Sequence, residues 1–449
     1  MARLFGTDGV RGVAGQELDA TLAYDLGRSG ATVLSAEKRR PRILVGRDTR
    51  ISGKMLEAAL SAGICSVGAD VVQVGVMPTP AVAWLTRHYG CDAGVVISAS
   101  HNPMEYNGIK FFDGRGYKLP DAVEDRIEEL IRDRRCDLPC ATGADIGTIA
   151  CMARAEDDYI AYLKTQIDVD IRGMKVALDC ANGAATDIAP RLFQELGAKV
   201  LAVYDTPDGV NINDSCGSTH MEYISRIVRD TDADIGFAFD GDADRMLAVD
   251  DTGDVIDGDR IMAICALDMK AQGLLDRNTL VVTVMSNLGL KVAMESEGID
   301  LAVTAVGDRY VLERMSEEGY AIGGEQSGHV IFLKGNTTGD GLISALKVLG
   351  ALKRSGTKLS QRKNVMDIYP QILVNVTVSS NEAKSLLQQD AVINEEILRV
   401  ERSYEGRGRV LVRASGTEPL IRVMVEGQDE QRVKRDAERI AALIKERLG

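Results

Sequence analysis

The sequence predicts an α/β protein made of three consecutive sheet domains followed by a smaller α+β domain. Two patterns carry this prediction. Short apolar runs alternate with helical apolar spacing up to about residue 368, and three strand-like runs then precede one long charged helix. The length of 449 residues fits several domains of ordinary size. The expected domains span 1–150, 151–256, 257–368 and 369–449.

Strand and helix signals alternate in the first two predicted domains. The helix between 43–46 and 71–76 is indicated by apolar residues at helical spacing, and a second helix is expected to begin with Thr79 as its N-cap and Pro80 next. A helix in the second domain is expected to end at Gly197. The expected strands are 43–46, 71–76, 95–97, 175–178, 199–204, 235–239 and 246–249.

The third and fourth predicted domains differ in character. The third alternates strands with a helix whose leucines share one face, whereas the fourth reads as a small sheet covered by a charged amphipathic helix. The expected strands are 279–284, 301–306, 320–322, 372–378, 410–412 and 420–425, and the expected helices are 341–352 and 429–448.

Ser100 follows an apolar, β-branched run that ends abruptly at Asn102-Pro103. Such a run is typical of a buried strand, and Asn-Pro marks the turn that ends it. Ser100 and His101 are therefore expected where a strand opens into a loop, which is where ligands bind in open α/β sheets. Taken alone, the segment is better explained as a turn in which Ser100 and Asn102 satisfy backbone groups.

Three carboxylates alternate at Asp240, Asp242 and Asp244 between two apolar runs. Packed together they would repel unless a cation lay among them, and hard oxygen ligands suit magnesium or calcium. A calcium-binding EF-hand loop would need glycine at its sixth position and glutamate at its twelfth. Those positions hold Arg245 and Asp251, so we favour a magnesium site over both an EF-hand and a solvated acidic turn.

The segment from Arg413 to Arg422 predicts a phosphate-binding loop. It follows an apolar run and offers two guanidinium groups, the hydroxyls of Ser415 and Thr417, and free backbone N–H groups around Gly416. Arginine binds phosphate with a planar fork, and successive N–H groups can cradle it. Without its two arginines the segment would read as an ordinary turn.

A further loop, 323–329, follows a strand-like stretch and carries Glu325, Gln326 and Ser327, with His329 at its end. These side chains can hydrogen-bond to a polyhydroxylated ligand, and paired glycines let the backbone approach it closely. On its own this pattern is as easily a glycine-rich bend.

Taken together, the four loops resemble the four active-site loops of the α-D-phosphohexomutase superfamily, in the same chain order. The opening at 5–12, the stretch 107–112 and the stretch 306–311 resemble the branch that acts on glucosamine phosphates. The resemblance covers nearly the whole chain, and it implies four domains around a central active-site cleft.

The resemblance also implies the reaction. Phosphorylated Ser100 would pass its phosphoryl group to glucosamine 6-phosphate, and a bisphosphorylated sugar would be both intermediate and activator on the way to glucosamine 1-phosphate. Mg²⁺ would be bound by Ser100, Asp240, Asp242 and Asp244, with catalysis assisted by Arg11, His101 and Lys110. Substrate would be bound by Arg245, Arg309, Glu325, Ser327, His329, Arg413, Ser415, Gly416, Thr417 and Arg422.

Composition limits the partners. The net charge of −14 argues against a nucleic-acid or membrane surface, so the expected partner is a small sugar phosphate held by local arginines. The chain shows no signal-peptide pattern or apolar run of transmembrane length, from which we expect a cytoplasmic protein with reduced thiols. Cys136, Cys140 and Cys151 make an incomplete zinc pattern. The resemblance allows a homodimer.

Other functions remain open at this point. Within the superfamily, the main alternative is a phosphomannomutase or phosphoglucomutase. Outside it, the serine and the aspartates would also fit a metal-assisted serine phosphatase, and the sugar and phosphate loops would fit a sugar-phosphate binding protein without catalysis. Isomerisation without net release of inorganic phosphate would exclude both of these last two.

Overall fold

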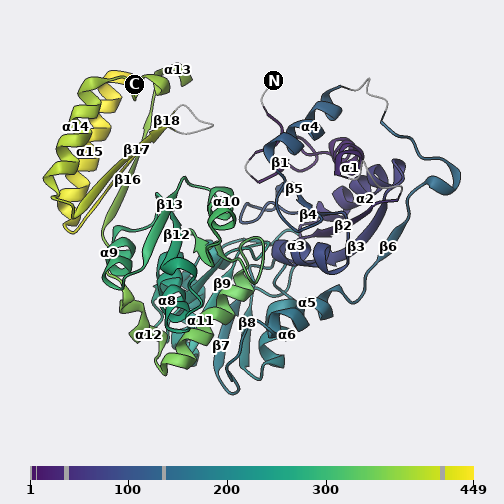
Figure 1. Ribbon diagram of the computed structural model, residues 1–449, viewed down its shortest axis with the longest axis horizontal. Coiled ribbons are helices and arrows are strands. Elements are labelled where there is room, and N and C mark those ends of the chain that lie inside the picture. The colour runs from purple at the N-terminus through teal and green to yellow at the C-terminus, as the bar shows by residue number, and fades with distance from the viewer. Residues whose placement is uncertain (1–2, 7, 35–39, 134–137, 415–419) are drawn as a thin grey trace. The chain divides into compact units, whose positions relative to one another are not determined.

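The computed structural model describes residues 3–6, 8–34, 40–133, 138–414 and 420–449. The chain forms two compact units, whose elements are labelled in Figure 1. Unit 1 comprises 1–285 and 299–365, and unit 2 comprises 286–298 and 366–449. Three sheets with helices lie in unit 1 and one small antiparallel sheet lies in unit 2, which confirms the predicted α/β class.

The first sheet of unit 1 has six strands in the order β1-β5-β4-β2-β3-β6. Strands β4, β2, β3 and β6 run parallel, whereas β5 is antiparallel to both β4 and β1. The strands are β1 Val10–Val13, β2 Arg42–Arg47, β3 Asp70–Val76, β4 Ala93–Ile97, β5 Tyr106–Asp113 and β6 Ile149–Cys151. The helices up to residue 164 are α1 Ala20–Leu34, α2 Gly53–Ser66, α3 Thr79–His88, α4 Asp121–Arg132 and α5 Ala155–Lys164.

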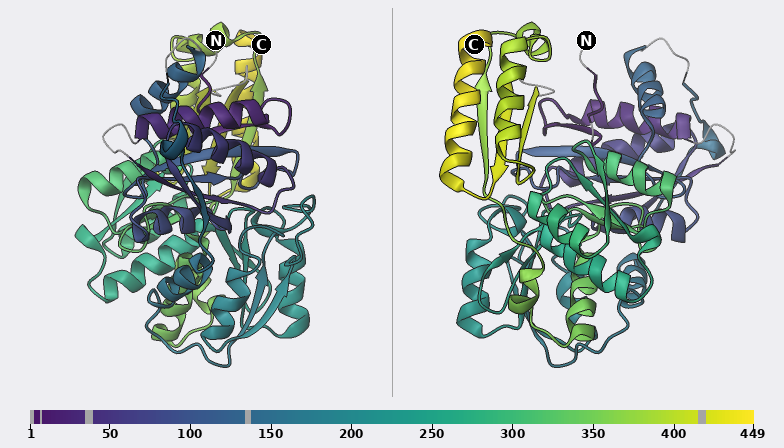
Figure 2. Two further views of the ribbon diagram at one scale, coloured as in Figure 1. Left: turned by 90° about the vertical axis from the view of Figure 1, so that its right-hand side faces the viewer. Right: turned by 60° about the vertical axis from the view of Figure 1, so that its left-hand side comes forward.

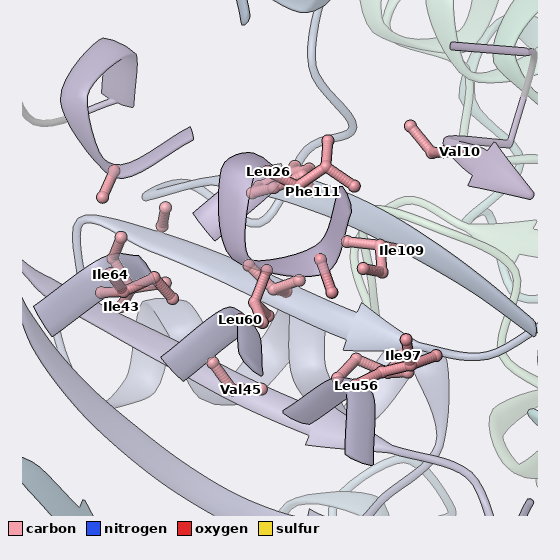
Figure 3. Close-up of a cluster of buried hydrophobic side chains, with 14 of the residues drawn as sticks. Val10, Leu26, Ile43, Val45, Leu56, Leu60, Ile64, Ile97, Ile109 and Phe111 are labelled. Atoms are coloured by element: carbon pink, nitrogen blue, oxygen red, sulfur yellow. The ribbon is translucent and has the colours of Figure 1, made fainter. Parts of the chain in front are cut away.

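Helices α1 and α2 form the core of this first domain with one face of its sheet. Leu26 of α1 and Leu60 of α2 lie among apolar side chains of β2, β4 and β5, as Figure 3 shows. The two helices pack backbone to backbone, because a Cβ atom at Gly63 would lie 2.1 Å from the carbonyl oxygen of Tyr24. Ile97, at the carboxyl end of β4 that leads into the Ser100 loop, belongs to this core.

Two further sheets complete unit 1. Their strand orders are β11-β10-β9-β7-β8 and β13-β12-β14-β15, and each combines parallel strands with an antiparallel edge. The second sheet contains β7 Lys175–Asp179, β8 Lys199–Val203, β9 Ile235–Phe239, β10 Met246–Val249 and β11 Val255–Ile256, with helices α6 Ile188–Glu195 and α7 Glu222–Thr231. The third contains β12 Thr279–Thr283, β13 Asp300–Thr304, β14 Ile322–Gly324 and β15 Val330–Phe332, with helices α8 Gly258–Ala271, α10 Asp308–Glu318, α11 Gly341–Ser355 and α12 Leu359–Arg362.

Unit 2 is a three-stranded antiparallel sheet, in the order β16-β18-β17, against which helices α14 and α15 pack (Figure 2). Its elements are α9 Leu288–Ser296, β16 Gln371–Thr377, α13 Asn381–Leu386, α14 Ala391–Ser403, β17 Gly408–Ala414, β18 Leu420–Gly427 and α15 Glu430–Leu448. Helix α9 joins this unit through Glu426, which is fully buried. Its carboxylate accepts the N–H of Leu288 at 2.8 Å and pairs with Arg409 at 2.6 Å.

The predicted strands and helices are present, with shifts of a few residues at their ends. The strand expected at 320–322 is β14, which begins two residues later. The N-cap prediction for Thr79 is wrong, since the cap is Pro78 and Thr79 is the first helical residue. Its hydroxyl donates to the Asp242 carboxylate. Among the described helices, none is both long and apolar enough to cross a membrane.

Candidate active site

Ser100 lies just beyond β4, whose five residues are all buried. Its backbone is left-handed, with φ of 53°, which is uncommon outside glycine. Its side chain is buried, and the hydroxyl donates a 2.6 Å hydrogen bond to Oδ2 of Asp240. The structure therefore brings the two loops that the sequence singled out first, 140 residues apart, into direct contact.

Asp240, Asp242 and Asp244 occupy the turn between β9 and β10, and all three are buried. One carboxylate oxygen from each lies within 4.8 Å of the other two, and among the described residues no other group of acids, histidines or cysteines meets this test for a metal site. The Oδ1 atoms of Asp242 and Asp244 are buried without a hydrogen-bond partner in the described structure. Buried, unpartnered carboxylate oxygens are the ligands that a hard cation such as Mg²⁺ takes.

The pKa values of the three carboxyls reflect their crowding. Burial raises the pKa of Asp240 well above its usual range, and the charges of Asp244 and Asp242 raise it further. Burial and Asp242 likewise raise the pKa of Asp244. Burial also disfavours the charge on Asp242, but the charges of Lys110 and Arg11 and the hydrogen bonds from Thr79 and Lys110 together lower the pKa of that carboxyl. A bound divalent cation would relieve the repulsion that the first two groups feel.

Lys110 and Thr79 hold Asp242 from two sides. Lys110, on β5, places Nζ 2.9 Å from Oδ2 of Asp242 and 4.0 Å from Asp244. Burial opposes the lysine charge, yet the two carboxylates raise its pKa. Thr79 donates its hydroxyl to the same Oδ2 at 2.7 Å and its backbone N–H to the Asp242 carbonyl at 3.0 Å. Sequence reasoning missed Thr79, because nothing near it in the chain signals a partner 163 residues away.

His101 and Arg245 lie beside Ser100. The Nδ1 atom of His101 is 3.4 Å from the Ser100 hydroxyl and 3.2 Å from Nη1 of Arg245. Burial, followed by the charges of Arg245 and Arg11, lowers the pKa of His101 to about 4. The imidazole is therefore neutral at pH 7, with Nδ1 able to accept a hydrogen bond from the guanidinium.

The predicted sugar loop is the tight connection between β14 and β15. The Glu325 carboxylate accepts the backbone N–H of Gly307 at 3.0 Å, and Ser327 is exposed at the tip. His329 is buried, and its Nε2 atom lies 3.5 Å from Asp308 and 4.0 Å from Asp244. Within the described structure, neither ring nitrogen of His329 makes a hydrogen bond. The loop therefore comes close to the carboxylate turn through His329.

A partly buried charge cluster lies next to this loop and was missed from the sequence. Lys118 donates to Asp8 at 2.8 Å and also pairs with Asp308. Arg309, which is predicted to bind substrate, pairs with Glu313 at 2.9 Å and with Asp121. Arg11 is 3.4 Å from Asp8. Two of these pairs, Lys118 with Asp308 and Arg309 with Asp121, join separate domains of unit 1 and leave no sign in the local sequence.

In unit 2, Arg413 and Arg422 are direct partners across β17 and β18, so their side chains leave the same face of the sheet. Burial and the charge of Arg422 lower the pKa of Arg413. Two facing guanidinium groups favour an anionic ligand. Three other predicted phosphate-loop residues, Ser415, Gly416 and Thr417, lie outside the described residues.

The cysteines do not assemble a metal site in the described structure. Cys140 and Cys151 are both free and exposed, and the third member of the sequence pattern, Cys136, lies outside the described residues. The incomplete zinc pattern thus gains no support.

Four family models match the chain in order and define its class. They are the phosphoglucomutase/phosphomannomutase alpha/beta/alpha domain I at residues 2–136, domain II at 157–253, domain III at 257–369, and the C-terminal domain at 373–443. This is the superfamily that the four loops resembled, and the resemblance is confirmed.

Full-length relatives narrow the class. The chain is 57% identical to a phosphoglucosamine mutase of Thermoanaerobacter sp. (strain X514) over 449 residues, covering 100% of both chains. It is 56% identical to a phosphoglucosamine mutase of Clostridium perfringens (strain 13 / Type A) over 444 residues, covering 99% of each. The chain therefore belongs to the phosphoglucosamine mutase family.

Solved structures share the fold. A phosphoglucomutase/phosphomannomutase family protein from Burkholderia thailandensis superposes with a TM-score of 0.82 at 26% identity, covering 100% of this chain and 99% of that one. Aspergillus fumigatus N-acetylphosphoglucosamine mutase, in complex with GlcNAc-6P and magnesium, superposes with a TM-score of 0.72 at 19% identity, covering 99% and 96%.

Proposed function

We propose that this protein interconverts glucosamine 6-phosphate and glucosamine 1-phosphate, with Ser100 as the phosphoryl carrier and a bisphosphorylated sugar as the intermediate. The observation that carries the proposal is the 2.6 Å hydrogen bond from the Ser100 hydroxyl to Asp240, one of three buried carboxylates. A nucleophile in contact with a hard-cation site is the arrangement that phosphoryl transfer needs. The names of the full-length relatives supply the sugar.

The reaction has two transfers. In the first, the free sugar hydroxyl attacks the phosphoryl group on Ser100; the new sugar O–P bond forms, the Oγ–P bond breaks, and the hydroxyl proton leaves to a base. After the bisphosphate turns around, the Ser100 oxygen attacks its other phosphoryl group; the Oγ–P bond forms, the sugar O–P bond breaks, the Ser100 hydroxyl loses its proton and the released sugar oxygen takes one up. This restores the phosphoserine and releases the isomer. The sugar bisphosphate can also prime an unphosphorylated Ser100, which makes it an activator.

Mg²⁺ is the cofactor that best fits the carboxylate turn. Asp240, Asp242 and Asp244, together with an oxygen on Ser100, would hold it, and it would neutralise charge that develops on the transferring phosphoryl group. The buried oxygens of Asp242 and Asp244 that accept no hydrogen bond in the described structure support this assignment.

The surrounding side chains divide the remaining tasks. Lys110 is a buried cation next to the carboxylate turn and stabilises charge there, since its raised pKa keeps it protonated at pH 7. The acceptor for the Ser100 hydroxyl proton is Oδ2 of Asp240, 2.6 Å from Oγ. Nδ1 of His101 lies 3.4 Å from the same oxygen. Arg245 donates toward His101 and fixes its ring.

Substrate binding is assigned to two places. In unit 1, Glu325, Ser327 and His329 would contact sugar hydroxyls, with Glu325 a candidate to favour the amine at the second carbon. In unit 2, Arg413 and Arg422, with the loop that contains Ser415, Gly416 and Thr417, would hold the phosphate that is not being transferred. Arg309 is a weaker candidate, because carboxylates already occupy its guanidinium.

The proposed substrate is tested by comparing kcat/KM for glucosamine 6-phosphate, glucose 6-phosphate and mannose 6-phosphate in one coupled assay. We expect glucosamine 6-phosphate to be preferred, with weak turnover of glucose phosphate, because a site that accepts a sugar in two orientations tolerates related sugars. Preference for either neutral sugar would support the phosphomannomutase or phosphoglucomutase alternative. Net release of inorganic phosphate would indicate the serine phosphatase instead.

A further inference from the structure

Arg50 is a fully buried arginine that lies behind the Ser100 loop, just after β2. Its Nη2 atom donates to the carbonyl oxygens of Ser100 at 2.9 Å and Asn102 at 2.7 Å, and Nη1 donates to the carbonyl of Pro103. Its Nε atom pairs with Asp48 at 2.9 Å, and the side chains of both partners have no solvent exposure. One guanidinium thus binds three carbonyls of the loop that carries the nucleophile.

The other side of the Ser100 backbone is fixed through Asp48. Ser98 donates its hydroxyl to Asp48 at 2.6 Å and accepts the N–H of Ser100 at 3.0 Å. A second domain adds Asn213, whose amide donates to the carbonyls of Ser100 at 2.8 Å and Asn102 at 3.1 Å. The N–H and the C=O of Ser100 are therefore both held by side chains.

These contacts hold a conformation that a serine does not favour. Ser100 is left-handed, and such residues persist only where their surroundings over-determine them. The Ser100 backbone also packs closely against the turn that carries the aspartates. A Cβ atom at Gly241 of that turn would lie 2.6 Å from the Ser100 carbonyl oxygen. In this conformation the Ser100 side chain points to Asp240.

We propose that Arg50 is a positioning residue for phosphoryl transfer, acting through the backbone of Ser100. It touches neither the reacting oxygen nor the carboxylate turn in the described structure. It keeps the nucleophile loop in one conformation while Ser100 alternates between hydroxyl and phosphate, with Asp48 and Asn213 as its helpers. Lysine cannot replace it, because a single ammonium lacks the planar fork that spans three carbonyls and a carboxylate. The inference rests on the proposed function.

The test compares Arg50→Lys and Asn213→Gly with a matched control, Arg47→Lys. Glycine suits position 213, where φ is 58°. Arg47 lies three residues before Arg50 and is largely buried. It pairs with Glu57 and donates to the backbone carbonyl of Asp48 at 3.2 Å, but no hydrogen bond joins its side chain to the Ser100 loop in the described structure. For Arg50→Lys we expect kcat to fall roughly 100-fold, the size of effect that a misplacement of about 1 Å produces, with KM changed less than about threefold. Asn213→Gly should show a smaller loss of the same kind, and the control should keep its kcat.

Hydrogen exchange supplies a readout that does not depend on turnover. Backbone amides at 99–104 should exchange faster in Arg50→Lys and Asn213→Gly than in the wild type, while Arg47→Lys should leave them unchanged. A folded Arg50→Lys protein with wild-type kcat, or with unchanged exchange at 99–104, would overturn the proposal, as would a loss that appears in KM alone. An equal loss in the control would also overturn it.

Two safeguards keep the outcomes separable. If Arg50→Lys does not fold, Asn213→Gly decides the question, because it removes two of the same carbonyl contacts without leaving a buried charge unpaired. If the wild type does not isomerise glucosamine 6-phosphate, the proposed function fails. The exchange comparison still decides whether Arg50 fixes the loop.

Discussion

Thr79 shows how a single hydroxyl outside the recognised loops can support the site. It donates to Oδ2 of Asp242, the same carboxylate oxygen that Lys110 binds. The other oxygen, Oδ1, makes no hydrogen bond in the described structure and is therefore available to bind a cation. A residue that orients a metal ligand in this way usually affects metal affinity or activity, since it fixes the ligand's geometry.

We therefore predict that Thr79→Val raises the Mg²⁺ concentration needed for half-maximal kcat by roughly 10–100-fold, the usual range for residues that orient a metal ligand. The measurement is kcat as a function of Mg²⁺ concentration. Thr86→Val is the matched control, because Thr86 is buried in the same helix and its hydroxyl donates only to the Val82 carbonyl among the described groups. If both variants show the same Mg²⁺ curve as the wild type, the Thr79 hydroxyl does not orient a metal ligand.

At the scale of elements, β17 and β18 bring two arginines face to face. We predict that Arg422→Ala raises KM for glucosamine 6-phosphate roughly 10–100-fold, because a charge-assisted contact to phosphate contributes about 1.5–3 kcal/mol. The loss of kcat should be smaller, since the phosphate bound here is not the one transferred. Arg407→Ala, an exposed arginine of the same unit, should behave as the wild type. A large loss of kcat at unchanged KM would place Arg422 in the chemistry.

Helix α4 contains an acid whose titration should be visible in stability. Burial raises the pKa of Glu124 to about 7, with Arg3 opposing the shift. Between about pH 4.5 and 7 the folded protein keeps a proton that the unfolded chain has released, so this contribution is full at low pH and lost as pH rises through 7.

We predict that the free energy of unfolding falls by about 1–3 kcal/mol across that window because of Glu124, and that Glu124→Gln removes this part of the slope. Denaturant unfolding at several pH values between 4.5 and 8.5 measures it. Glu129→Gln, on the exposed side of the same helix, should keep the wild-type slope. The same slope in wild type and Glu124→Gln would contradict the assignment.

Across the whole molecule, the features that could be predicted from the sequence are those formed by residues close together in the chain. The apolar run before Ser100 and the alternating aspartates are each contiguous, so both loops could be found and placed at strand ends. Thr79 and Arg50 could not be found this way, because their roles come from contacts with Asp242 and Ser100 that only the folded sheets create. For the same reason the pairing of Arg309 with Asp121 could not be predicted from the sequence.

The central claim is that one phosphoryl group passes from Ser100 to the sugar and back. The most direct measurement is a chase of protein carrying ³²P on Ser100 with unlabelled glucosamine 6-phosphate, with products separated in time. We predict that label leaves Ser100 and appears in the sugar bisphosphate and then in sugar monophosphate, and that Ser100→Ala protein takes up no label and does not isomerise the substrate. Label that stays on the protein during turnover, or that appears as inorganic phosphate, would contradict the account.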